Sequence, residues 1–243
     1  MKALRAAWRF SKVLVHLAYG LWIIRRVFPG LSTAEQEARV QAWAVAMLDR
    51  LALQLVVRGK PSHGPVLLAS NHISWADIVV MHAARHCRFI SKDDVKHWPI
   101  VGTLATAAGT LYISRESPRD AMRVVHHMVE CLKAGDVLAV FPEGTTGDGS
   151  SLLPFHGNLL QAAISAQSPV QPVALSFTDA TTGQHSLAPC FIGDDTLVQS
   201  LWRTLRADNL LAIVQFGEPE VSNGRDRRQW ALDLRETIAA LRA

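Results

Sequence analysis

Several features that define specialised protein classes are missing from this sequence of 243 residues. It contains three cysteines, Cys87, Cys131 and Cys190, without a CxxC pair, so we expect no disulfide framework and a reducing compartment. The sequence also lacks a GxSxG elbow, a GxxxxGK(S/T) loop and an HExxH helix. These absences argue against a nucleophile-elbow hydrolase, a P-loop nucleotidase and a zincin.

Long apolar runs are absent as well. The most apolar stretch near the N-terminus, Val13–Ile24, has 12 residues and is interrupted by His16. A helix that spans a bilayer needs about 20 apolar residues. A basic start followed by an apolar run is also typical of a signal peptide, but Arg25–Pro29 offers no small-residue cleavage pattern. We therefore favour a helix that lies on the membrane over a cleaved leader, and the sequence leaves open whether the helix could also span.

The composition is that of a globular protein with an uneven charge distribution. Hydrophobic residues make up 49% and charged residues 19%, which excludes a disordered chain. Residues 1–60 hold 10 Lys or Arg and 3 Asp or Glu, whereas residues 61–243 hold 15 and 18. The net charge of +4 therefore comes from the N-terminal quarter. A basic, apolar N-terminus favours an anionic membrane surface as partner, and we expect no nucleic acid.

The N-terminal segment is predicted to be an amphipathic helix. Its basic side chains lie on one stripe at helical spacing: Arg5, Arg9, Lys12 and His16. Its apolar side chains lie opposite: Phe10, Leu14, Leu17, Leu21 and Phe28. This pattern favours a helix in the headgroup region with its basic stripe toward anionic lipid. The alternative is a helix packed on its own domain.

A second helix is predicted after the break at Pro29-Gly30. Ser32 and Glu35 form a capping box, and the helix runs to about Leu53. Residues 1–52 are thus predicted to form a membrane-associating helical hairpin, followed by a main domain at 53–243.

The main domain alternates β-branched runs with helical ones, which predicts an α/β fold with a largely parallel sheet flanked by helices. Strands are expected at Leu53–Arg58, Val66–Ser70, Arg88–Ser91, Thr110–Ser114, Val137–Phe141, Val170–Ser176 and Leu211–Phe216. Helices are expected at Trp75–Arg85, Pro99–Ala107, Pro118–Ala134, Gly157–Ala166, Leu197–Arg206 and Arg225–Leu241. Ligand sites in such sheets lie at the carboxyl ends of strands.

Residues suited to catalysis or ligand binding follow three of these strands. His72 comes directly after a strand and Asp77 follows five residues later, so Asp77 can hold one imidazole nitrogen while the other acts as a base. The same spacing also fits an Asn-His turn with Asp77 as a charge at a helix start. Arg115 follows another strand and is either an anion ligand or a surface arginine. Phe141–Gly149 contains three glycines, which permit close approach of a ligand.

In this order, the motifs resemble those of the glycerolipid acyltransferase family, and bacterial 1-acylglycerol-3-phosphate acyltransferases in particular. Asn71, His72 and Asp77 match the first motif, and Gly109, Ile113 and Arg115 the second. Phe141 to Thr145 match the third motif, Pro169–Ala174 match the fourth, and Phe89–Lys92 with Pro99 and Gly102 match a lysine-bearing segment. The resemblance covers about residues 55–178. The family's third motif ends in Arg, and Thr146 stands there instead.

The resemblance implies a glycerol-3-phosphate acyltransferase-like fold and a set of site residues. The catalytic residues would be His72 and Asp77, with Asn71 and Ser74 in supporting positions. Substrate-binding residues would be Arg115, Glu143, Gly144, Thr145 and Lys92. His72 would take the proton from a lysolipid hydroxyl that attacks the thioester of acyl-CoA or acyl carrier protein, without a metal or cofactor.

The acceptor implied first is 1-acyl-sn-glycerol-3-phosphate, which would give phosphatidic acid, and we expect a peripheral, monotopic enzyme on the cytoplasmic face of the inner membrane. Because a hydroxyl at Thr146 cannot replace a guanidinium, lyso-ornithine lipid and other lysophospholipids stay open as acceptors. More remote alternatives are a hydrolase with Ser70 or Ser74 as nucleophile and a non-catalytic membrane-binding protein.

Overall fold

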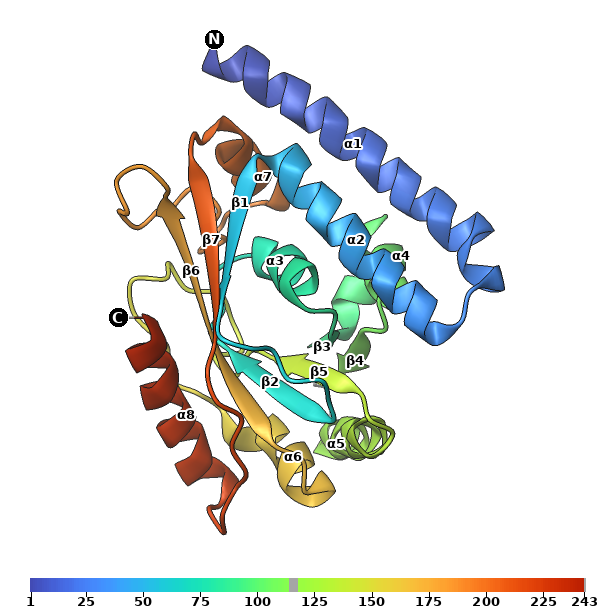
Figure 1. Cartoon of the computed structure of the whole chain (residues 1–243), viewed down its shortest axis with the longest axis vertical. Coiled ribbons are helices and arrows are strands. Elements are labelled where there is room, and N and C mark those ends of the chain that lie inside the picture. The colour runs from blue at the N-terminus through green and yellow to red at the C-terminus, as the bar shows by residue number, and fades with distance from the viewer. Residues whose placement is uncertain (114–117, 243) are drawn as a thin grey trace.

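The computed structural model describes residues 1–113 and 118–242, and it has a seven-stranded sheet at its centre (Figure 1). The strands are β1 (Leu53–Arg58), β2 (Val66–Ser70), β3 (Arg88–Lys92), β4 (Leu111–Ile113), β5 (Val137–Val140), β6 (Val170–Asp179) and β7 (Leu210–Phe216). Their order is β1-β7-β6-β2-β5-β3-β4. Every neighbouring pair is parallel except β6 and β7, which are antiparallel. The predicted α/β fold with a largely parallel sheet is confirmed.

Helices cover both faces of the sheet. They are α1 (Lys2–Arg26), α2 (Thr33–Leu51), α3 (Ala76–Ala84), α4 (Val101–Ala107), α5 (Pro118–Lys133), α6 (Leu160–Ala166), α7 (Leu197–Arg206) and α8 (Arg227–Arg242). Short 3-10 turns occur at Phe28–Gly30, Asp93–His97 and Gly157–Leu159. One hydrophobic cluster joins the sheet to α1, α2, α3 and α7, and a second joins it to α5, α6 and α8.

Strand β2 lies at the centre and is buried along its whole length. Val66 and Leu68 belong to one cluster, while Leu67 and Ala69 belong to the other. A strand that is buried on both faces reads as a continuous apolar run rather than an alternating one. Its neighbour β5 runs in parallel register with it. The carboxyl ends of β2 and β5 therefore meet at one edge of the sheet, and this meeting positions the site described below.

The predicted helical hairpin is present, and its second helix begins as the sequence indicates. The Ser32 hydroxyl accepts a hydrogen bond from the Glu35 backbone N–H at 3.4 Å, and the Glu35 carboxylate accepts one from the Ser32 N–H at 2.8 Å. This reciprocal capping box satisfies donors that would otherwise lack partners at the start of α2. Helix α2 ends at Leu51, before the left-handed residue Ala52.

The orientation predicted for α1 is wrong, because its basic stripe faces the protein. Arg5 forms an ion pair with Asp208. Arg9 donates to the carbonyl oxygens of Leu205 and Ala207 at 2.8 and 2.9 Å. These carbonyls lie at the C-terminal end of α7, where the helix dipole favours a cation.

His16, a third member of the stripe, also lies inward. His16 is buried and stacks on the Trp43 ring of α2 with a centroid separation of 4.8 Å. Its Nε2 atom lies 3.0 Å from the Trp43 carbonyl oxygen, and the Trp43 indole N–H donates to the His16 carbonyl at 3.2 Å. Lys12 is partly buried. The alternative, a helix packed on its own domain, is therefore the arrangement found.

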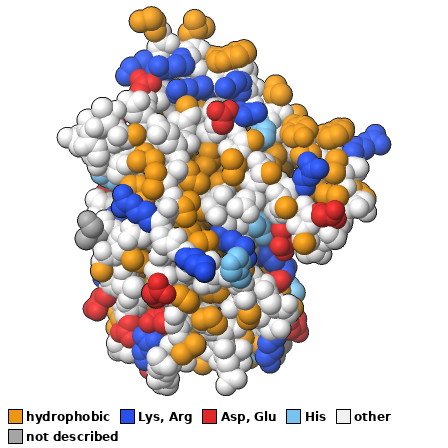
Figure 2. Space-filling model, in the orientation of Figure 1, with side chains coloured by type: hydrophobic (Ala, Val, Ile, Leu, Met, Phe, Trp, Pro, Cys, Tyr) orange, Lys and Arg blue, Asp and Glu red, His pale blue; other side chains and the backbone are white. Residues whose placement is uncertain are grey.

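The outward face of α1 is apolar and aromatic. Its exposed members recur at helical spacing: Leu4, Trp8, Val15, Tyr19 and Trp22. Trp8 is 66% exposed and Trp22 is 53% exposed. Hydrophobic side chains are visible at both ends of α1 in Figure 2, with basic side chains beside them. Among the described residues, no helix combines the length and the apolar character needed to cross a bilayer.

Candidate active site

The turn between β2 and α3 brings His72 and Asp77 together. The Nδ1 atom of His72 lies 2.8 Å from Oδ2 of Asp77, in the first turn of α3. The same carboxylate oxygen accepts hydrogen bonds from the backbone N–H groups of Ile73 at 2.7 Å and Ser74 at 2.9 Å. Asp77 is fully buried. The predicted approach of these two side chains is confirmed.

This geometry leaves one nitrogen of His72 free to act as a base. Because Oδ2 of Asp77 accepts, the hydrogen-bond network assigns the proton to Nδ1 and leaves Nε2 as the acceptor. Within the described part of the chain, Nε2 makes no hydrogen bond. The His72 side chain is 19% exposed and lines a cavity. An oriented neutral imidazole with an open nitrogen is suited to general base catalysis.

Two phenylalanines fix the plane of the His72 ring. Phe141, directly after β5, stacks on His72 with centroids 3.9 Å apart and planes 9° apart. Phe89 of β3 in turn stacks on Phe141 at 5.6 Å. The ring is thus held at its edge by Asp77 and at its face by Phe141. Sequence reasoning missed the contribution of Phe89, which has no local signal because the contact requires β3 and β5 to be neighbours.

Glu143 joins the third motif to the first. Its Oε1 accepts the backbone N–H of His72 at 3.2 Å, and its Oε2 accepts that of Leu153 at 3.3 Å. The N–H of Gly147 donates to the His72 carbonyl at 2.9 Å. Burial raises the pKa of Glu143, and the hydrogen bonds from His72 and Leu153 oppose that rise. The Glu143 loop (residues 141–156) therefore holds the His72 backbone from both sides.

A cavity of about 580 Å³ opens beside His72. Its walls are mainly apolar and come from the hairpin, α3 and α4, with Leu17, Gly20, Trp43, Met47, Ile78, Val79, Leu104 and Ala105 among the lining residues. Polar residues line it too, among them His72, Lys92, Arg39, Thr145 and Thr146. Such a cavity suits a molecule with an apolar chain whose reactive end lies at His72.

The other predicted substrate-binding residues fall into three groups. Lys92, Gly144 and Thr145 line the cavity, as expected of ligand contacts. The carboxylate of Glu143 is engaged by backbone groups, so its position is that of a support for His72. Arg115 lies outside the described residues. Contact of any of these residues with a substrate stays a prediction.

Neither serine of the hydrolase alternative is placed as a nucleophile for His72. The Ser74 hydroxyl donates to the carbonyl of Pro189 and accepts the N–H of Ala76. The Ser70 hydroxyl donates to the carbonyl of Asn71. Both serines are buried, and neither is hydrogen-bonded to His72 in the described structure. A nucleophile requires hydrogen-bond reach to its base, so the geometry disfavours this alternative.

A segment without a sequence signal completes the site. Residues 184–196, here called the crossing segment, pass over the first and third motifs. The N–H of Phe191 donates to the Ile73 carbonyl at 3.3 Å, and the Thr146 hydroxyl donates to the Phe191 carbonyl. Phe191 also lines the cavity. The residue that departs from the third motif, Thr146, therefore ties this segment to the Glu143 loop.

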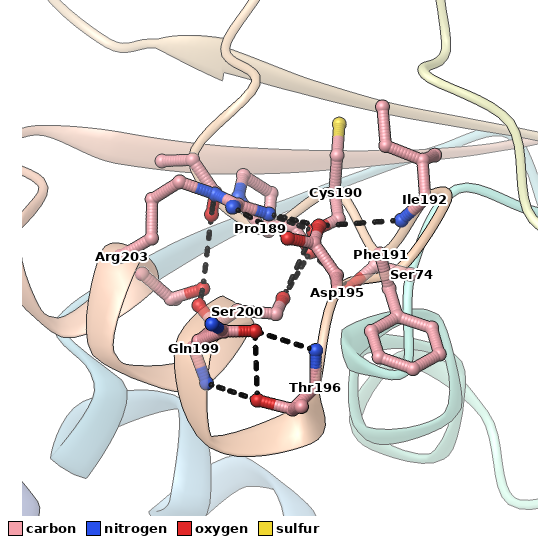
Figure 3. A network of polar contacts seen from close by, with 12 residues as sticks. Ser74, Pro189, Cys190, Phe191, Ile192, Asp195, Thr196, Gln199, Ser200 and Arg203 are labelled. Atoms are coloured by element: carbon pink, nitrogen blue, oxygen red, sulfur yellow. Dashed lines mark hydrogen bonds and ion pairs between the residues drawn. The ribbon is translucent and has the colours of Figure 1, made fainter.

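Side chains of helix α7 hold the crossing segment in place through hydrogen bonds and an ion pair (Figure 3). Arg203 forms an ion pair with Asp195 at 2.8 Å and donates to the carbonyls of Ala188 and Cys190. The Ser200 hydroxyl lies 2.9 Å from the Cys190 carbonyl oxygen. These bonds satisfy the backbone of a segment that has no strand or helix of its own, so its path across the site is fixed.

Asn71 offers a test of how the turn before His72 is held. Its amide donates to the Leu175 carbonyl at 3.0 Å, and its oxygen accepts the Leu175 N–H at 2.7 Å, both in a buried position. The side chain thus extends the pairing of β2 with β6. The Asn71→Ala variant is expected to lose about 2–5 kcal/mol of unfolding free energy, because two buried backbone groups lose their partners. Urea denaturation measures this loss, and a change below about 0.5 kcal/mol would contradict it.

Comparisons with known proteins agree with this geometry. Residues 54–176 match the model of a family described as Acyltransferase. A lyso-ornithine lipid O-acyltransferase from Pseudomonas aeruginosa is 36% identical, over 98% of this chain and 93% of that protein. A 1-acyl-sn-glycerol-3-phosphate acyltransferase from Neisseria gonorrhoeae is 37% identical, over 82% of this chain and 77% of that protein.

A solved structure of an acyltransferase is similar along the whole chain. It is that of the 1-acyl-sn-glycerophosphate acyltransferase PlsC from Thermotoga maritima, with a TM-score of 0.71. The alignment covers 100% of this chain and 98% of the other at 19% sequence identity, which shows a shared fold.

Proposed function

This chain belongs to the Acyltransferase family, and on that premise we propose that it is a membrane-associated lysolipid O-acyltransferase. It transfers a fatty acyl group from acyl-CoA or acyl carrier protein to the free hydroxyl of a lysolipid. The observation that carries the proposal is the His72–Asp77 pair, with an open Nε2, at an apolar cavity of about 580 Å³. The cavity accommodates acyl chains, and the base activates the hydroxyl.

The reaction follows from this arrangement. Nε2 of His72 takes the hydroxyl proton while the lysolipid oxygen forms a bond to the thioester carbonyl carbon. The carbon–sulfur bond then breaks, and the thiolate leaves with the proton that His72 received. Asp77 stabilises the imidazolium that forms between these steps, and it keeps the ring in the productive tautomer. The thioester is already activated, so the proposal involves no metal or organic cofactor.

Backbone amides of the Glu143 loop are suited to stabilise the oxyanion. The N–H groups of Thr145 and Thr146 donate to no other group in the described residues, and both residues line the cavity. Preorganised N–H donors of this kind stabilise charge that develops in a transition state. Lys92 and Gly144, also at the cavity, would contact the acceptor headgroup.

Two acceptors are proposed. The first is 1-acyl-sn-glycerol-3-phosphate, the substrate named for the Neisseria gonorrhoeae relative, which would give phosphatidic acid. The second is lyso-ornithine lipid, named for the Pseudomonas aeruginosa relative. Thr146 favours the second, because it presents no cation for a phosphate and its hydroxyl is bonded to the crossing segment.

Membrane association is proposed through the outward face of α1. Its apolar and aromatic side chains would enter the interfacial region of the bilayer, and Arg25 and Arg26 in its last turn are exposed for contact with anionic lipid. Both lysolipid and product reside in the bilayer, so this docking brings the cavity to its substrate. We place the enzyme as a peripheral, monotopic protein on the cytoplasmic face of the inner membrane.

The proposed function is tested by assaying purified protein with acyl-CoA and with acyl carrier protein. Each donor is combined with lysophosphatidic acid, lyso-ornithine lipid or lysophosphatidylcholine, and products are identified by mass spectrometry. We expect acylation of at least one of the first two lysolipids. Release of free fatty acid without any acylated lipid would instead support a hydrolase, and the absence of turnover with every pair would support a binding protein.

A further inference from the structure

Helix α8 reaches the Glu143 loop from outside the region that matches the family model, which ends at residue 176. Trp230, Ala231, Leu234 and Ile238 are the buried residues of α8, and they belong to the cluster shared with α5 and α6. Arg235 and Arg242 are seven residues apart, about two helical turns, so they lie on the same side of α8. The C-terminal end of α8 lies beside the loop (Figure 1).

Arg235 fixes the peptide group that Glu143 uses. Its Nε donates to the Leu153 carbonyl at 3.0 Å and its Nη2 to the Leu152 carbonyl at 2.6 Å. The N–H of Leu153 donates to Oε2 of Glu143, whose Oε1 accepts the N–H of His72. Leu153 is therefore held at both its carbonyl and its amide. A continuous series of hydrogen bonds leads from α8 to the backbone of His72.

Arg242 holds the same loop at Gly149. It is half-buried and donates to the Gly149 carbonyl. Gly149 has a φ of +77°, and a Cβ atom there would lie 3.0 Å from Cδ1 of Ile73 and 3.0 Å from Cε1 of His185. This part of the loop thus packs directly against the turn that carries His72 and against the crossing segment.

Arg242 also brings a positive charge toward two carboxylates of the loop, Glu143 and Asp148. Two charged or titratable groups, His72 from the turn before α3 and Arg242 from α8, lower the pKa of Glu143. Burial raises the pKa of Glu143, and the charge of Arg242 opposes that rise. The ionisation of Glu143 matters, because only the carboxylate can accept an N–H group at each of its two oxygens. In the protonated acid one oxygen carries a hydrogen, and this O–H would face an N–H group that also donates.

We propose that Arg235 and Arg242 are positioning residues of the acyl transfer reaction, which hold the Glu143 loop so that Glu143 fixes the backbone of His72. Arg235 acts through the peptide group of Leu153. Arg242 acts through Gly149. The inference rests on the proposed function in taking His72 as the general base.

The test compares kcat and KM over a range of pH for Arg235→Ala, Arg242→Ala and Arg242→Lys, with Arg228→Ala as the control. Arg228 lies on the same helix and is exposed. We expect kcat to fall about tenfold for each alanine variant, with the KM for the acyl donor nearly unchanged. Arg228→Ala should behave like the wild type.

The pH dependence separates the two arginines. Without the Arg242 charge, the pKa of Glu143 rises, so Glu143 takes up its proton at higher pH. The acid limb of the kcat profile of Arg242→Ala should therefore move to higher pH, and Arg242→Lys should restore it. Arg235→Ala should leave the limb in place, because the Arg235 guanidinium is hydrogen-bonded to the carbonyls of Leu152 and Leu153 and forms no ion pair with Glu143 in the described structure. In a Glu143→Gln background, Arg242→Ala should cause no further movement.

A merely structural role predicts a lowered unfolding temperature with an unmoved acid limb in every variant, and that result would overturn the proposal. If Arg242→Ala does not fold, Arg242→Gln, which also removes the charge, takes its place in the pH profile, and Arg235→Ala tests the fall in kcat independently. The rate at which diethyl pyrocarbonate modifies His72, followed by peptide mass spectrometry, needs no acceptor lipid. We expect this rate to change in Arg242→Ala and not in Arg228→Ala, so this readout still tests the inference if no lysolipid is acylated and the proposed function fails. An unchanged rate would contradict the inference.

Discussion

The His72→Ala variant should lose acyl transfer by a factor of about 10²–10⁴ in kcat, the range that general base catalysis contributes. Binding of the acyl donor should persist, because the cavity walls are provided by other residues. The measurement is initial-rate acylation of a detergent-dispersed lysolipid, with donor binding followed separately by quenching of tryptophan fluorescence. Full activity of this variant would refute the assignment of His72 as the base.

The Asp77→Asn variant distinguishes orientation of the base from simple loss of a side chain. An asparagine amide would present an N–H to Nδ1 of His72, which drives the proton to Nε2 and removes the lone pair needed at the hydroxyl. We expect kcat to fall by a similar factor of about 10²–10⁴ while the fold is kept. The Ile73 and Ser74 amides donate to the same oxygen, Oδ2, that His72 faces, so an NH2 group in that place would also leave them without an acceptor and lower the unfolding free energy. A variant with wild-type kcat would show that the tautomer of His72 does not matter.

The triple variant Trp8→Ser, Tyr19→Ser and Trp22→Ser should release the protein from lipid vesicles. Each aromatic side chain contributes about 1.5–3 kcal/mol when it is fully buried, and these three are partly exposed on the outward face of α1. Partial burial of all three in the bilayer predicts a fall in the partition coefficient by a factor on the order of 10²–10³. Co-sedimentation with vesicles of phosphatidylethanolamine and phosphatidylglycerol measures the change.

Leu232→Ser is the matched control, because Leu232 is an exposed apolar residue on α8, a helix of the other face of the sheet. Its binding to vesicles should equal that of the wild type. Wild-type binding by the triple variant, together with loss of binding at high salt, would show that charge dominates and that the outward face has been misassigned. Neutralising Arg5 and Arg9 tests something else, the docking of α1 on α7, because both side chains are engaged within the protein.

The features that the sequence predicted well are those built from neighbours in the chain. His72 and Asp77 are five residues apart, and the capping box of Ser32 and Glu35 spans three. Strands such as β2 and helices such as α7 follow the predicted ranges because apolar periodicity and local caps act over a few residues. Each motif directly follows a predicted strand. Because the strands are parallel, the reactive groups at their carboxyl ends lie at one edge of the sheet.

The predictions that failed or went further than the sequence could support concern side chains whose partners lie far along the chain. The basic stripe of α1 was predicted to face lipid. The acceptors that turn it inward are Asp208 and the carbonyls at the end of α7, which are 203 and 196 residues away from Arg5 and Arg9. Glu143 lies in a glycine-rich segment of a kind typical of ligand sites. Its carboxylate oxygens nevertheless accept hydrogen bonds from the N–H groups of His72, 71 residues away, and of Leu153. The apolar face predicted for α1 is also wrong, because Phe10 and Leu17 pack on the protein, whereas the outward face consists of other side chains, Trp8 and Trp22 among them.

By itself, the sequence therefore determined the α/β fold class, the helical hairpin and the pairing of a histidine with its carboxylate. Hydrogen bonding and hydrophobic periodicity within a few residues are enough to specify these features. Only the tertiary structure decided which face of α1 points outward, that the crossing segment closes over Thr146, and that α8 holds the Glu143 loop through Arg235 and Arg242. Those contacts join residues that meet only when the whole sheet is assembled, since the stability of each depends on burial that no local segment provides.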